Sequence, residues 1–282
     1  MKRLVSIEFQ KIWKSKASRV LTLAYFVLLS LLSLIASINF NIGPIHIKLA
    51  EQGIFEFPYI WHFNTYFTAI FKLFLAVVIV SMVANEYSYG TLKQNLIDGM
   101  SKKEFILSKF LMVVLFALAS TIFVFFVSFV LGISFSHSTS LGSIFSELEY
   151  LLAFFVKLIG FFSFCLFLGV LIKKSAFALG VLFLWFLFEN ISYAILRYQF
   201  FNEATEMHQN LDNFYNLFPL RAMSNLIVEP ISRLSFIKNI SQQVGVANLK
   251  DYAVHWYVLL IVLCWTFIFV YSSWRILKKR DL

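Results

Sequence analysis

The sequence predicts an all-α integral membrane protein with six transmembrane helices, and three observations support this. Its residues are 60% hydrophobic and only 14% charged, with a mean hydropathy of +0.79, whereas an ordinary soluble domain is about half apolar and a quarter charged. Six apolar runs are each long enough to cross the ~30 Å hydrocarbon layer of a bilayer as a helix. Lysine and arginine flank these runs unevenly, as they do in multi-pass membrane proteins. We therefore expect one transmembrane domain over residues 1–282.

Residues 1–18 predict a basic amphipathic helix. With a rotation of about 100° per residue, one face carries Val5, Phe9, Ile12 and Trp13, and the opposite face carries Arg3, Gln10, Lys11 and Lys14. Such a helix lies along a membrane surface. The apolar run Val20–Ile38 that follows is long for a signal peptide and precedes further spans, so we expect an uncleaved first span.

The other five candidate spans follow in order, and basic residues orient them. They are Phe63–Ala84, Phe110–Ile133, Leu151–Ile172, Phe177–Ile195 and Tyr257–Trp274. Sixteen lysine and arginine residues flank one side of the six runs and six flank the other. Because basic residues favour the cytoplasmic side, we expect both termini and residues 85–109 in the cytoplasm. We also expect the chain to be a multi-pass protein of the plasma membrane, in a bacterium.

The polar segment 85–109, between the second and third spans, carries its own helix signals. Thr91 is placed to cap a short helix, and Gly99 suits the left-handed end of that helix. Ser101 and Glu104 have the spacing of a capping box that opens the next helix. The segment is therefore expected to be folded.

Residues 196–256 form the longest outer connection, between the fifth and sixth spans. It is too short and too sparsely apolar for an independent domain. We expect short helices at the outer leaflet, one around Phe214–Leu220 and a second over Ile231–Val244.

The sequence lacks the common motifs of catalytic and nucleotide-binding sites. The sequence has no phosphate-binding loop, no dinucleotide fingerprint, no H-E-x-x-H and no G-x-S-x-G. The five histidines have no ligand spacing, and the two cysteines fall in apolar runs, where a thiol behaves as a small hydrophobic group. The net charge of +9 is explained by cytoplasmic membrane flanks and not by nucleic acid. We expect no enzyme activity and no cofactor or metal site in this chain.

Three charges lie inside the predicted spans, namely Lys72, Lys157 and Glu189. Buried charges in a span are rare and costly, so each calls for a partner, a route to the interface or a transport path. Lys157 and Glu189 lie about sixteen residues on either side of the turn at 173–174, which predicts one depth on adjacent helices and an ion pair. The alternatives are a snorkelling lysine and a glutamate that lines a pore alone.

The run from Asn85 to Phe105, NEYSYGTLKQNLIDGMSKKEF, resembles the type-2 exporter (ABC-2) permeases of ABC transporters. The resemblance rests on an E-x-x-x-G-T-L core, formed by Glu86, Gly90, Thr91 and Leu92, placed after the second of six spans and behind the basic N-terminal helix. It implies that 85–109 holds a coupling helix that docks on an ATP-binding subunit, that 1–18 is an elbow helix, and that 196–256 holds re-entrant helices.

The resemblance also implies partners and roles. Two ATP-binding subunits would carry the ATP and Mg²⁺, and a second permease, identical or homologous, would complete a pore. Leu92, Leu96, Ile97 and Met100 would fill an apolar cleft of the ATP-binding subunit, while Lys93, Lys102 and Lys103 would steer docking. The alternative is a membrane assembly or immunity protein that only binds partners; a secondary transporter is disfavoured because paired inverted repeats are lacking. The substrate and the direction of transport stay open.

Overall fold

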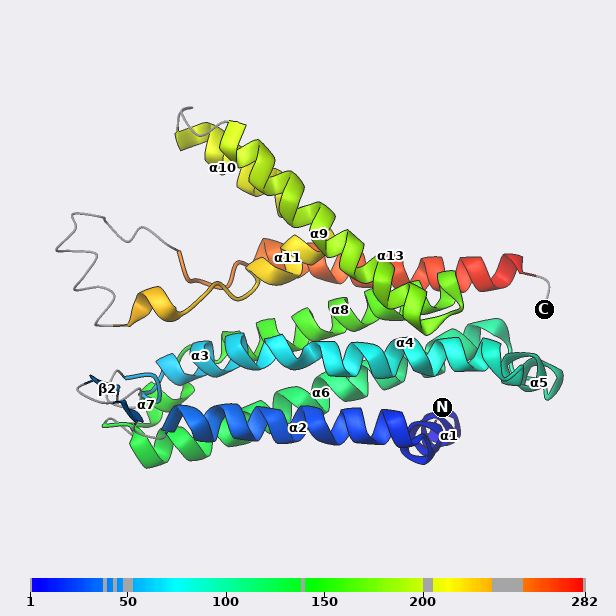
Figure 1. Ribbon diagram of the computed structural model, residues 1–282, viewed down its shortest axis with the longest axis horizontal. Coiled ribbons are helices and arrows are strands. Elements are labelled where there is room, and N and C mark those ends of the chain that lie inside the picture. The colour runs from blue at the N-terminus through cyan, green and yellow to red at the C-terminus, as the bar shows by residue number, and fades with distance from the viewer. Residues whose placement is uncertain are drawn as a thin grey trace.

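The structure, a computed structural model, describes residues 2–37, 40–42, 45–47, 53–137, 140–199, 205–234 and 251–280. The long helices are α2 Lys16–Ser37, α4 Lys72–Ser88, α6 Lys102–Phe135, α8 Glu149–Ile172, α9 Ser175–Gln199 and α13 Trp256–Lys279. The shorter ones are α1 Lys2–Lys14, α3 Tyr59–Thr68, α5 Thr91–Ile97, α7 Leu141–Phe145, α10 Thr205–Tyr215 and α11 Pro219–Asn225, with 3-10 turns η2 Ala69–Phe71 and η3 Ile231–Arg233. They form an elongated bundle (Figure 1).

Five helical stretches in the described chain are long and apolar enough to cross a membrane. They are Tyr59–Ser88, Lys102–Phe135, Leu141–Ile172, Ser175–Gln199 and Trp256–Lys279, and they coincide with five of the six predicted spans. The remaining candidate, Val20–Ile38, is helical within α2 up to Ser37, and Ile38 lies outside the described residues.

The bundle is built around α8, which contacts α13, α4, α6 and α9. Of the apolar stretch of α8, 78% is buried, against 11% for α9, so α8 is the core helix and α9 lies at the periphery. Gly160 allows the close approach of α8 and α13, because a Cβ there would lie 2.7 Å from Val262 Cγ1. α8 ends at Ile172, and the short turn to α9 makes the expected antiparallel hairpin.

Two local departures from the prediction have clear causes. The all-α prediction misses a two-stranded antiparallel hairpin, β1 Phe40–Ile42 and β2 Ile45–Ile47, whose strands flank a Gly-Pro pair in the sequence. The helix expected around Phe214–Leu220 is in fact two helices, because Phe218 is extended before Pro219, and Pro219 opens α11. Of the second expected helix, only residues 231–234 are described, and they begin with the 3-10 turn η3.

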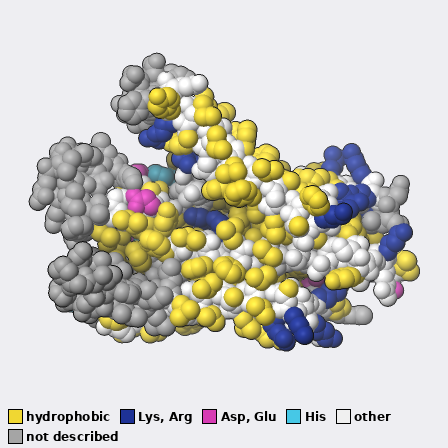
Figure 2. Space-filling view, viewed as in Figure 1, with side chains coloured by type: hydrophobic (Ala, Val, Ile, Leu, Met, Phe, Trp, Pro, Cys, Tyr) yellow, Lys and Arg dark blue, Asp and Glu magenta, His cyan; other side chains and the backbone are white. Residues whose placement is uncertain are grey.

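The two ends of the bundle differ in composition. Figure 1 shows both termini, α1 and α5 at one end, and the hairpin, α7 and α10 at the other. In the face shown in Figure 2, apolar side chains cover the length of the helices, and lysine and arginine gather at the end with the termini. Residues 85–109 therefore share one end with both termini, as the sequence predicts.

Candidate functional site: the segment between α4 and α6

The expected 25-residue segment is more compact than the sequence suggests. α4 continues to Ser88 and α6 begins at Lys102, so only α5 and two short turns connect the two long helices. α5 is therefore joined closely to both α4 and α6.

Glycines and caps fix the two turns around α5. Gly90 has φ +70° and Gly99 has φ +95°, backbone conformations that L side chains rarely adopt. Thr91 was expected to cap α5, but Gly90 holds the cap position and the Thr91 hydroxyl donates to Glu86 Oε2. The capping box at α6 is confirmed, since Ser101 Oγ accepts from Glu104 N and Glu104 accepts from Ser101 N. These hydrogen bonds hold the pKa of the exposed Glu104 carboxyl below its usual value.

Four charged side chains, which we call the ionic anchor, tie this segment to the bundle: Glu8 and Lys11 of α1, Glu86 of α4 and Lys109 of α6. Lys109 is fully buried, and its Nζ donates to Glu8 Oε2 and, at 2.7 Å, to Glu86 Oε1. Lys11 Nζ also donates to Glu86 Oε1, at 2.8 Å. The ionic anchor thus joins three helices directly beneath α5.

Lys11, the partly exposed member of the ionic anchor, is held in its charged form by the two carboxylates beside it. Burial lowers the pKa of Lys11, but its hydrogen bond to Glu86 and the charges of Glu8 and Glu86 raise it more, so the pKa lies above its ordinary value. Glu86 also accepts from Asn95 Nδ2 of α5 at 3.3 Å, which fastens α5 itself to the ionic anchor.

A groove of about 450 Å³ opens between α1, α4 and α5, beside the ionic anchor. Polar residues that line it include Lys14, Ser15 and Ser18 from the α1–α2 junction, Asn85 from α4, and Tyr89 and Thr91 at the start of α5. The outer side of α1 is apolar, with Phe9 and Trp13 exposed and stacked on each other. α1 therefore offers a polar side to the groove and an aromatic side to its surroundings.

The predicted docking residues divide between buried and exposed positions. Glu86 and Leu92 are 3% and 2% exposed and hold the segment against the bundle, and their docking role stays a prediction. Leu96 is half-buried and packs against the core, whereas Ile97 is 82% exposed. Lys102 donates to the backbone carbonyl of Arg280 at 2.8 Å, and Lys103 is exposed.

The predicted ion pair between Lys157 and Glu189 is wrong, because α11 lies between them. Glu189 accepts from the backbone N–H groups of Leu220 and Arg221, in the first turn of α11, and from Trp185 Nε1. Lys157 Nζ lies 3.4 Å from the carbonyl oxygen of Ser224, in the last turn of that helix. An acidic side chain at the N-terminus of α11 and a basic one at its C-terminus both interact favourably with the helix dipole.

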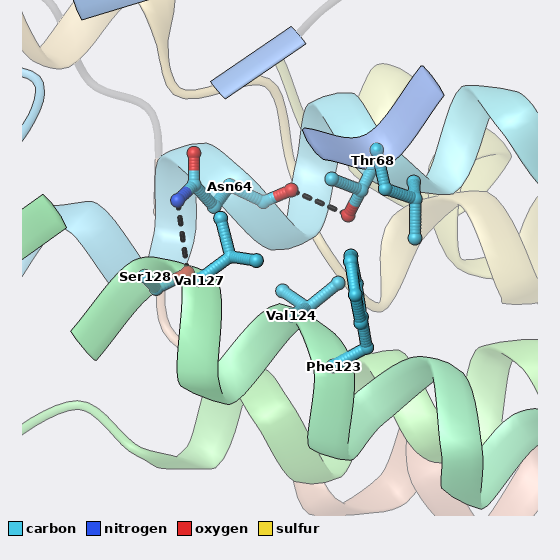
Figure 3. A pocket seen from close by; sticks show the side chains of 7 residues that line it. Asn64, Thr68, Phe123, Val124, Val127 and Ser128 are labelled. Atoms are coloured by element: carbon cyan, nitrogen blue, oxygen red, sulfur yellow. Dashed lines mark hydrogen bonds between the residues drawn. The ribbon is translucent and has the colours of Figure 1, made fainter. Parts of the chain in front are cut away.

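A smaller pocket between α2, α3 and α6 serves packing (Figure 3). There Asn64 Nδ2 donates to Ser128 Oγ at 2.8 Å, and Thr68 Oγ1 donates to the Asn64 carbonyl at 2.6 Å. Such hydrogen bonds join helices in a membrane. Within the described ranges, no three His, Cys, Asp or Glu side chains lie close enough together to hold a metal ion.

Comparison with known proteins decides the family. The family model described as ABC-2 family transporter protein matches residues 3–282, nearly the whole chain. The chain belongs to the ABC-2 family of transporter proteins. A search among curated proteins finds no match.

Family membership makes this ABC-2 chain a multi-pass membrane protein and a component of a membrane transporter. Members of the ABC-2 family associate with an ATP-binding subunit and are generally not catalytic themselves. Sequence reasoning found the segment 85–109 but missed Glu8 as its anchor. The available signal was that Glu8 is the one acidic residue among the first fifty residues of the sequence.

Proposed function

We propose that this chain is the permease subunit of an ATP-driven exporter and that α5 docks a separate ATP-binding subunit. The observation that carries the proposal is the construction of the segment: a seven-residue helix with an exposed Ile97, bounded by two positive-φ glycines and fastened to three helices by the ionic anchor. A docking element that transmits movement needs an exposed contact and a stiff connection, and this segment has both.

The ionic anchor suggests how movement of a partner would reach the membrane. A partner that pushes α5 would move the ends of α4 and α6 together, because α5 joins them through short turns. Glu86 and Lys109 would carry α1 along through Glu8 and Lys11. Packed helices respond to such a push as rigid bodies that rotate or shift between two arrangements.

The proposed topology places α5, both termini and the turn at Lys173 and Lys174 in the cytoplasm, with α2 as the first of six spans. It is supported by the basic end of the molecule in Figure 2 and by the positive-inside bias. α1, which Figure 1 shows nearly end-on beside α2, would lie along the inner membrane surface as an elbow helix, with Phe9 and Trp13 among the lipids. The membrane would be the plasma membrane of a bacterium.

The exposed face of α9 is proposed to pack against a second permease, identical or homologous, with one ATP-binding subunit, carrying ATP and Mg²⁺, on each. Support comes from the low burial of α9 and from its large exposed apolar side chains, among them Phe177, Leu184 and Phe188. The bundle of one chain is filled around α8, so a transport path fits better at an interface between two permeases than inside one.

Co-purification of the ATP-binding subunit with matched variants tests the docking proposal. Ile97→Asp places a charge at the exposed tip of α5, and we expect it to lower the amount of bound ATP-binding subunit about tenfold or more. Leu141→Asp is the control, because Leu141 is 74% exposed at the opposite end of the molecule. Leu96 is a poorer test position, since it packs against the core. Unchanged co-purification of Ile97→Asp contradicts the proposal.

A further inference from the structure

Two lysines stand at one level inside the membrane-spanning bundle. Lys72 opens α4, about 24 Å from the end of that helix at Ser88, and Lys157 on α8 is about 22 Å from Ile172, at a rise of ~1.5 Å per residue. α4 and α8 pack against each other, and both end at the side of the molecule that carries α5. The Lys72 side chain reaches α8 at the ring of Phe161, one helical turn from Lys157.

The surroundings of the two lysines provide aromatic rings and a carbonyl. Lys72 Nζ lies 4.6 Å from the ring centroid of Phe161, and Lys157 Nζ lies 6.0 Å from that of Tyr66. The contact of Lys157 with the Ser224 carbonyl is long, at 3.4 Å, and uses one of three ammonium protons. Among the residues that the structure describes, no carboxylate pairs with either lysine, and Glu189 is engaged by α11.

Two like charges at membrane depth are costly unless something compensates them. Lys157 is only 4% exposed, too buried for its ammonium group to reach water by snorkelling. Aromatic rings offset only part of the desolvation of a cation. A single anionic group that contacts both ammonium groups would compensate both charges at once.

We propose that Lys72 and Lys157 form a membrane-level binding site for the anionic group of an amphiphilic molecule. The inference rests on the proposed function, because this molecule would be the cargo of the permease. Lys72 is half-buried, and its neighbours Ile70 and Leu73 are 57% and 55% exposed and apolar. The molecule would therefore approach from the bilayer, with its anionic group at the lysines and its apolar part against Ile70 and Leu73 at the start of α4.

Binding of dodecyl phosphate to the full chain in phosphatidylcholine nanodiscs tests the site. We expect saturable binding that Lys72→Met and Lys157→Met each weaken at least tenfold. Lys72→Arg keeps the charge and should stay within threefold of the unchanged chain. Lys279→Met, at the exposed end of α13, is the control and should not change binding.

Competitors and stability measurements complete the test. Excess inorganic phosphate and dodecylphosphocholine should both fail to displace the probe, because one lacks the apolar part and the other lacks net charge. Displacement by inorganic phosphate would contradict a membrane ligand, and displacement by dodecylphosphocholine would contradict recognition of the anion. Variants are compared only if they are monodisperse with an unchanged melting temperature; if Lys157→Met fails this criterion, the half-buried Lys72→Met decides.

The outcome is separable from that of the proposed function, since binding requires no ATP-binding subunit. A chain that retains its ATP-binding subunit but binds dodecyl phosphate no better than Lys72→Met contradicts the site alone. A chain that binds dodecyl phosphate but associates with no ATP-binding subunit contradicts the docking proposal and leaves the site standing.

Discussion

Lys109 shows how one buried residue can hold three helices together. Its side chain is fully buried, and its charge is compensated by Glu8 of α1 and Glu86 of α4, themselves 2% and 3% exposed. Removing such charges from water costs several kcal/mol for each ion, and only short, well-directed contacts offset that cost. The group is therefore sensitive to the loss of any one member.

Replacing Lys109 should destabilise the protein far more than replacing a nearby exposed lysine. Lys109→Met removes the buried cation and leaves Glu8 and Glu86, among the described residues, with the partly exposed Lys11 as their cationic partner, so we expect a loss of about 3–5 kcal/mol in the free energy of unfolding. Lys103→Met is the control and should change it by about 0.5 kcal/mol or less. A denaturant titration in mixed micelles measures both, and equal effects would show that the ionic anchor does not stabilise the fold.

Replacing Gly90 should act through strain in the backbone, because its φ angle is positive. A Cβ at Gly90 meets no atom within 4 Å, so Gly90→Ala costs only the left-handed conformation, about 1–2 kcal/mol, and should weaken docking of the ATP-binding subunit by displacing α5. Gly180 also has open space but lies in helix α9, so Gly180→Ala should be neutral or stabilising by about 0.5–1 kcal/mol. Co-purification and unfolding measurements that rank the two variants alike would refute this account.

At the scale of elements, α11 is held between two charged helices. Glu189 of α9 accepts from the N-terminal turn of α11, and Lys157 of α8 lies at its C-terminal turn. Ala222 and Met223 of this short helix are buried in the core, so apolar packing and these polar contacts together fix its place.

Glu189→Gln should loosen α11. An amide has one acceptor oxygen where the carboxylate has two, so at least one of the N–H groups of Leu220 and Arg221 loses its partner. We expect a loss of about 1–3 kcal/mol in the free energy of unfolding. Asn190→Ala, which removes only a hydrogen bond to the carbonyl of Phe186 in the same helix, is the control and should have a smaller effect. A larger effect of the control would overturn the assigned role of Glu189.

Short-range sequence patterns predict part of the fold, and the features that they do not predict depend on contacts between residues far apart in the sequence. Ser101 and Glu104 are three residues apart, so their capping box could be identified from the sequence. The neighbouring helices α8 and α9 followed from their short turn, but the position of α11 between Lys157 and Glu189 depends on packing that no short-range pattern encodes. The contact of Glu8 with Lys109 joins residues 101 positions apart, which is why the ionic anchor was missed.

At the scale of the whole molecule, the arrangement of the two ends implies a membrane topology. α5 and both termini lie at one end, and α7 and the hairpin lie at the other, separated by the length of the apolar bundle (Figure 1). Since basic residues favour the cytoplasmic side, the end with α5 is expected inside the cell.

Cysteine labelling in whole cells tests this topology. A cysteine at Ser140 should react with an impermeant thiol reagent added outside, and a cysteine at Ser101 should react only after the membrane is opened, since both positions are exposed. The background should carry Cys264→Ser, because Cys264 is the exposed one of the two native cysteines. Labelling of Ser101→Cys from outside would reverse the orientation.

The central claim is that α5 is the contact point for an ATP-binding subunit, and site-specific photocrosslinking measures that contact directly. A photoreactive phenylalanine analogue replaces Ile97, at the tip of α5, or Leu141, at the opposite end; these side chains are 82% and 74% exposed. The account predicts a covalent adduct with the ATP-binding subunit from position 97 and none from position 141. No adduct from position 97, or equal adducts from both positions, would contradict it.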